Sequence, residues 1–127
     1  WIIGRTLYVT FFPIIELVDR YTIALLKHEK TNDNQQELDW YTQHLQTYDV
    51  SSIQEDLVSL YNIHKQIWSL EAELKAGKEN NLSLEEIGRR AIKIRDWNHE
   101  RIALKNTMAE KLNRDDVREK KFEHLSE

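Results

Sequence analysis

The chain has 127 residues and a formal net charge of −4, with 40% hydrophobic and 31% charged residues. This balance is typical of one globular domain and excludes a disordered chain, while the mixed charges do not form the basic surface of a nucleic-acid binder. The absence of cysteine excludes disulfides, thiolate nucleophiles and cysteine-based metal centres.

The first segment, residues 1–12, is predicted to form a short extended arm. Apart from Leu7, residues 6–12 are β-branched or aromatic, a composition typical of strands. The apolar run over residues 7–15 is too short to cross a bilayer, and no small-residue cleavage site follows it. We therefore expect a cytoplasmic protein that does not associate with a membrane.

Two helices are predicted next, over residues 13–30 and 35–48. Pro13 suits the first turn of a helix, and apolar residues then recur at the helical period. In the second helix, Trp40 lies off the main apolar face, and Tyr48 follows near its end. Exposed aromatic area of this kind, together with the apolar arm, predicts a homodimer.

Two longer helices are predicted over residues 52–76 and 83–112. Each begins with a serine that is followed three residues later by a glutamate, the pattern of a capping box. Gly77 is predicted to end the first of them in a left-handed conformation, and Asn113 to end the second. Because the link between these helices is short, they should form an antiparallel hairpin, whose apolar face the first two helices would cover.

The predicted fold class is therefore all-α. Residues 1–127 form a single domain, an antiparallel helical bundle of about four main helices with a short N-terminal extended arm. Residues 114–127 are dense in charge and form a tail that is either a short helix or frayed. One proline and three glycines in the whole chain favour such long helices.

Polar residues interrupt the apolar faces, and these interruptions point to a site. Asn98, Arg101 and Lys105 replace three apolar residues in the middle of the inward face of the last helix. Because burying charge is costly unless it is paired, one explanation is an internal network in which Arg101 and Lys105 pair with Glu71 and Asp19. Glu71 is the expected partner of Arg101. The others are an inter-helix pocket for an anionic ligand, and a boundary position from which the charges reach solvent. The candidate ligand-binding residues are Asp19, Thr22, His64, Trp68, Glu71, Asn98, Arg101 and Lys105.

No residue set predicts a reaction. Asp96 and Glu100 lie one turn apart, and Asp96 has the basic Lys93 one turn before it, which favours a solvated face. The five histidines have no metal-ligand spacing, and the chain has no glycine-rich phosphate loop. We expect no metal and no cofactor, and no catalytic residue is assigned.

Three segments, taken in order, resemble a family of small bacterial proteins of unknown function that are often encoded near lipopolysaccharide and glycosyltransferase genes. They are residues 16–23 (ELVDRYTI), 67–74 (IWSLEAEL) and 95–106 (RDWNHERIALKN). The chain departs from the family pattern at Ala72 and His99, where the family has acids. The resemblance supplies a genomic context but no activity. It implies a shared signature of Asp19, Thr22, Trp68, Glu71, Asn98, Arg101 and Lys105.

These observations lead to two main hypotheses. The first is a binding module that holds an anionic small molecule, such as a phosphate, a nucleotide sugar or a carboxylate, in the inter-helix polar cluster. The alternative is a structural or adaptor protein whose cluster only fixes helix packing. Helical chorismate mutases are similar in using Arg and Lys within a bundle, but their first helix is very long, whereas residues 31–34 interrupt this one.

Overall fold

The computed structural model describes the backbone of residues 13–79 and 81–126, and the side chains of residues 13–77 and 81–113. Within these residues the chain is helical and has no strand, which confirms the all-α class. The predicted extended arm over residues 1–12 lies outside the described residues. The elements are α2 (Ile14–Thr31), α3 (Gln35–Leu45), the 3-10 turn η1 (Ser51–Ile53), α4 (Gln54–Glu79) and α5 (Leu84–Ser126).

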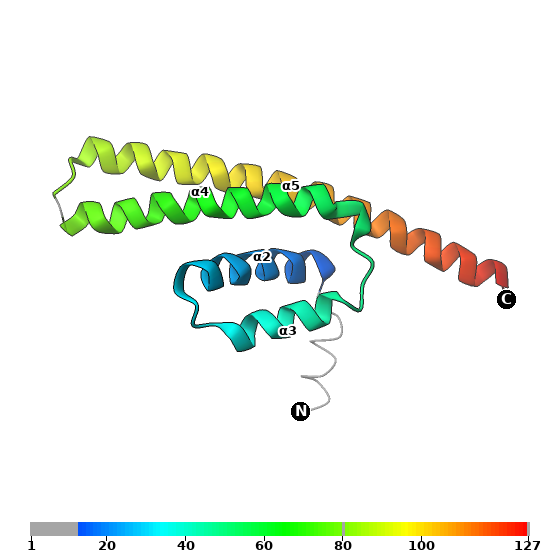
Figure 1. Ribbon diagram of the computed structural model, residues 1–127. Coiled ribbons are helices and arrows are strands. Elements are labelled where there is room, and N and C mark those ends of the chain that lie inside the picture. The colour runs from blue at the N-terminus through cyan, green and yellow to red at the C-terminus, as the bar shows by residue number, and fades with distance from the viewer. Residues whose placement is uncertain (1–12, 80, 127) are drawn as a thin grey trace, which may run out of the picture.

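Helices α4 and α5 form the predicted antiparallel hairpin, the longest part of the molecule (Figure 1). Helix α2 packs against both helices of the hairpin, and α3 packs against the other side of α2 (Figure 1). The prediction that both N-terminal helices cover the hairpin is therefore right for α2 but wrong for α3. The free end of the hairpin and the C-terminal part of α5 extend past α2 in opposite directions (Figure 1).

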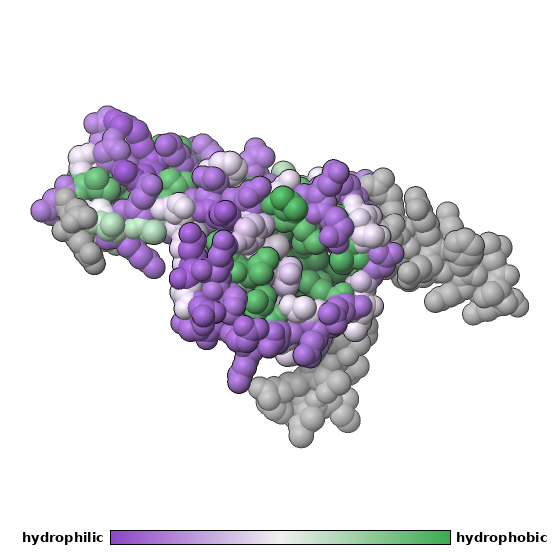
Figure 2. All heavy atoms as spheres, in the orientation of Figure 1, coloured by the Kyte–Doolittle hydropathy of each residue, from purple (hydrophilic) through white to green (hydrophobic). Residues whose placement is uncertain are grey.

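The hydrophobic core lies where α2, η1, α4 and α5 meet. Its members come from the apolar faces expected from the helical period, and each contributes about 1.5–3 kcal/mol through burial. Helix α3 has no buried residue. Figure 2 accordingly shows apolar surface over α2, bordered by polar surface over α3 and over the free end of the hairpin. The core cluster consists of Val18, Ile53, Leu60, Met108 and Leu112.

The end of α4 differs from the prediction that placed it at Gly77. The helix continues to Glu79, and Asn81 adopts the left-handed conformation with a φ of 58°. The Leu82 N–H donates to the Gly77 carbonyl at 2.9 Å, as in a Schellman motif, and the Leu82 side chain lies against Gly77. Gly77 thus provides room for Leu82 and does not reverse the chain itself.

Other helix ends differ from the prediction too. Helix α4 begins at Gln54, because the predicted capping residue Ser52 lies inside the 3-10 turn η1. Helix α5 begins as predicted, because the Ser83 hydroxyl accepts a hydrogen bond from the Glu86 N–H at 3.1 Å. The prediction that Asn113 ends this helix is wrong, since α5 continues to Ser126. No glycine or proline follows Asn113, and asparagine alone is a mild helix breaker. Helix α3 is shorter than predicted and ends at Leu45.

Exposed aromatic side chains lie on and after α3, as predicted. Trp40 is 43% exposed and Tyr48 is 36% exposed, and the Trp40 ring stacks on His44 with ring centroids 3.8 Å apart. The homodimer that these residues suggested stays a prediction. Among the described residues, no helix has both the length and the apolar character needed to cross a bilayer.

Candidate functional site

The side chain of Asp19 is the centre of the polar residues between the helices. It projects from α2 and is only 3% exposed. Arg101 of α5 binds it with two hydrogen bonds, from Nη2 to Oδ2 at 2.6 Å and from Nε to Oδ1 at 3.2 Å. His64 of α4 adds a third, from Nε2 to Oδ1 at 3.0 Å. One buried carboxylate therefore joins α2 to both helices of the hairpin.

Lys105 extends this group by bridging two acids of α2. Its Nζ lies 2.9 Å from Glu16 Oε1 and 3.6 Å from Asp19 Oδ2. We call Glu16, Asp19, His64, Arg101 and Lys105 the Asp19 cluster. With His64 neutral, two carboxylates balance two cations, so the internal network expected from the sequence is present.

The cluster holds Asp19 in its ionised form. Burial by itself raises the pKa of the Asp19 carboxyl, but hydrogen bonds from His64 and Arg101 and the charges of Arg101 and Lys105 together bring that pKa well below its usual range. The hydrogen bond with Asp19 likewise raises the pKa of Arg101. Because an ionised carboxylate only accepts hydrogen bonds, His64 Nε2 must carry the proton that it shares.

A cavity of about 280 Å³ lies beside the cluster, between α2, α4 and α5. Half of its lining is apolar, and the other half comes from side chains with polar groups. Five of the eight residues predicted from sequence line it, so a pocket is present next to the internal network. The lining residues are Ile23, Leu26, His64, Ile67, Trp68, Glu71, Asn98 and Arg101.

The predicted pairing of Arg101 with Glu71 is wrong. Arg101 pairs with Asp19, whereas Glu71 is exposed and makes no hydrogen bond or ion pair with other described residues. Asn98 is half-buried, and its amide also has no partner among the described residues. Both residues are left with polar groups that are free to bind at the cavity.

Two further candidates act within the protein and do not line the cavity. The Thr22 hydroxyl donates to the Asp19 backbone carbonyl at 2.7 Å, an ordinary bond within one helix, and Thr22 is buried. Lys105 is occupied by its two acids. Sequence reasoning missed Glu16, although its position three residues before Asp19 places both acids on one face of α2.

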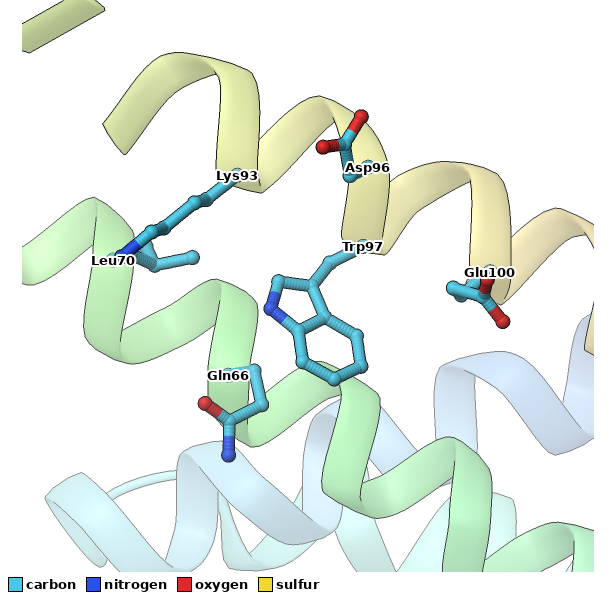
Figure 3. A pocket seen from close by; sticks show the side chains of 6 residues that line it. All are labelled: Gln66, Leu70, Lys93, Asp96, Trp97 and Glu100. Carbon is cyan, nitrogen blue, oxygen red and sulfur yellow. The ribbon is translucent and has the colours of Figure 1, made fainter. Parts of the chain in front are cut away.

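A second, more open hollow of about 680 Å³ lies on another side of the hairpin. Figure 3 shows the Trp97 indole extending from α5 towards α4, near Gln66 and Leu70, while Asp96 points away from α4. Asp96 also pairs with the neighbouring Arg95 at 3.3 Å. The acids here do not converge with the indole, which agrees with a solvated face.

No group of three or more acidic or histidine side chains that could hold a metal occurs in the described part of the chain. Comparison with models of protein families, with curated proteins and with solved structures gives no match. The function must therefore be argued from the Asp19 cluster and the cavity beside it.

Proposed function

We propose that this protein is a small helical binding module that holds a small molecule with an acidic group in the cavity between α2, α4 and α5. The observation that supports it is the combination, in one cavity, of an apolar wall with polar groups that lack partners. Ligand sites of small molecules have this composition, a mainly apolar lining with a few polar groups that fix orientation. The cavity volume of about 280 Å³ is close to the lower limit of about 300 Å³ for ligand pockets, so it suits a small compound.

Arg101 is the proposed anchor for the acidic group. Its Nε and Nη2 bind Asp19, and its Nη1 makes no hydrogen bond with the described residues. A guanidinium has a second edge that can bind a carboxylate or phosphate while the first edge stays occupied. Asp19 would hold the guanidinium in place before the ligand arrives, which lowers the entropy cost of binding.

Asn98 and Trp68 have supporting roles in this proposal. Asn98 lies one turn before Arg101 on α5, so its amide can donate to the same acidic group. Trp68 offers an aromatic wall and an indole N–H without a partner in the described residues. The resemblance to a family encoded near lipopolysaccharide and glycosyltransferase genes adds nucleotide sugars to the ligands worth testing.

The rival proposal is a structural or adaptor protein, and the charge balance of the Asp19 cluster favours it. The two cations already have carboxylate partners, so the cluster can fix α2 on the hairpin without any ligand. In that case Asn98 would be an ordinary half-buried residue and Glu71 an ordinary exposed one, and neither would bind a ligand. The two proposals differ in whether an added compound stabilises the fold.

Thermal unfolding with a panel of phosphates, nucleotide sugars, dicarboxylates and amino acids separates the two proposals. A ligand at about 100 times its Kd adds about 2.7 kcal/mol, which raises Tm by several degrees in a domain of this size. Asn98→Ala should reduce the rise, whereas the matched control Asn106→Ala, at an exposed position of α5, should keep it. No rise with any compound would favour the structural role, and an unchanged rise in Asn98→Ala would place the bound compound outside this cavity.

A further inference from the structure

At one end of the cavity, the Glu71 carboxylate has no partner among the described residues. Glu71 lines the same cavity as Arg101 but makes no hydrogen bond or ion pair with the described residues, and Lys75, one turn farther along α4, does not pair with it. We propose that the ligand is dipolar, with an acidic group at Arg101, a protonated amine at Glu71 and an apolar chain between them. This inference rests on the proposed function and names its ligand class.

The charges around the cavity argue against a simple anion. Glu16 and Asp19 already balance Lys105 and Arg101, so Glu71 leaves the site with one net negative charge when His64 is neutral. A ligand with only an acidic group would add a second net negative charge to the site, and like charges repel. A dipolar ligand adds no net charge, and its amine gives Glu71 the partner that it lacks.

The spacing along α4 sets the separation of the two charged groups. His64 and Arg101 meet at Asp19, and Glu71 lies seven residues farther along α4 than His64. At a rise of about 1.5 Å per residue, that offset is about 10 Å along the helix axis. Side chains lean towards the N-terminus of their helix, so the Glu71 side chain leans back towards the height of His64 and shortens the gap.

The wall between the two ends is apolar. Ile67 and Trp68 line it from α4, and Ile23 and Leu26 line it from α2. A chain of several methylene groups fits such a wall, because its burial is favourable and it has no polar group to satisfy. An α-amino acid carries both charges on one carbon and does not span the offset. The geometry therefore favours an ω-amino acid, and 6-aminohexanoate is a suitable probe.

The experiment is titration calorimetry of the 127-residue chain with a matched series of compounds. The series is 6-aminohexanoate, hexanoate, hexylamine and glycine. We expect 6-aminohexanoate to bind about five-fold more tightly than hexanoate, the gain that one exposed ion pair gives. Glu71→Gln should reduce that ratio to about one without weakening hexanoate binding, whereas Glu110→Gln, an exposed acid of α5 outside the cavity, should keep the ratio.

Several results would overturn the dipolar ligand. If hexanoate binds as tightly as 6-aminohexanoate, the proposed amine site at Glu71 is refuted, and the proposed function is unaffected. Equal affinity for glycine would refute the spacing, and stronger binding of hexylamine would refute Arg101 as the anchor. If no compound of the series binds, the inference fails, and the thermal panel then decides separately whether the cavity binds any other acidic compound.

Discussion

Replacing Arg101 by methionine removes the guanidinium from the Asp19 cluster and keeps most of the apolar stem. The Asp19 carboxylate, which is 3% exposed, then loses both hydrogen bonds from Arg101, at 2.6 and 3.2 Å. Hydrogen bonds to charged groups contribute about 1.5–3 kcal/mol each, and removing one partner of a buried ion pair costs about 3–5 kcal/mol.

Two features of the site reduce that cost. Lys105 Nζ remains 3.6 Å from Asp19 Oδ2, and the Arg101 side chain is 28% exposed, so water can enter the space that it leaves. We therefore expect Arg101→Met to lower the free energy of unfolding by about 3 kcal/mol, at the lower end of the range for a buried pair. Urea unfolding followed by far-UV circular dichroism measures this as a lower midpoint with an unchanged slope.

A double-mutant cycle tests which acid Arg101 contacts. The cycle of Arg101→Met with Asp19→Asn should give a coupling free energy of about 2 kcal/mol, because the two side chains touch. The cycle with Glu71→Gln should give less than about 0.5 kcal/mol. As a control, Arg95→Met at an exposed position should change stability by no more than about 0.5 kcal/mol. Negligible coupling of Arg101 with Asp19, or larger coupling of Arg101 with Glu71, would refute the arrangement of the Asp19 cluster. It would also refute the proposal that Asp19 orients the guanidinium for a ligand.

Acid titration and a pair of glycine substitutions give the remaining predictions. Because the folded-state pKa of Asp19 lies below its ordinary value of 3.8, ionised Asp19 stabilises the fold above that pH, and this contribution is lost as pH falls towards the lower pKa. Asp19→Asn should therefore flatten the acid limb of a plot of Tm against pH, and an unchanged limb would contradict this. Gly88→Ala should raise stability by about 1 kcal/mol, since the added Cβ would have no described atom within 4 Å apart from its chain neighbours and its own helix backbone. Gly77→Ala should lower it in the same thermal melts, because its Cβ would collide with Leu82. Equal effects at the two glycines would contradict the close contact of Leu82 with Gly77 at the end of α4.

The sequence by itself determined the helices and the faces that they bury. The α2 span agrees with its prediction within one residue, because helical period and end signals depend on neighbours within one turn. For the same reason, the inward position of Arg101 and Lys105 could be read from the pattern of α5 alone. Two of the helix ends that were wrong, at Gly77 and Asn113, are places where the local signal was a single weak residue.

Only the tertiary structure decided which residues meet. A helical pattern gives the face of each side chain, but it does not give the height at which two helices align or which helix lies next to which. Helix α2 runs parallel to α4 and places Asp19 beside His64 and Arg101, whereas Glu71 falls seven residues farther along (Figure 1). Burial then determines which acid is paired. The buried carboxylate of Asp19 needs cationic partners because it is removed from water, whereas the exposed carboxylate of Glu71 is solvated and needs none.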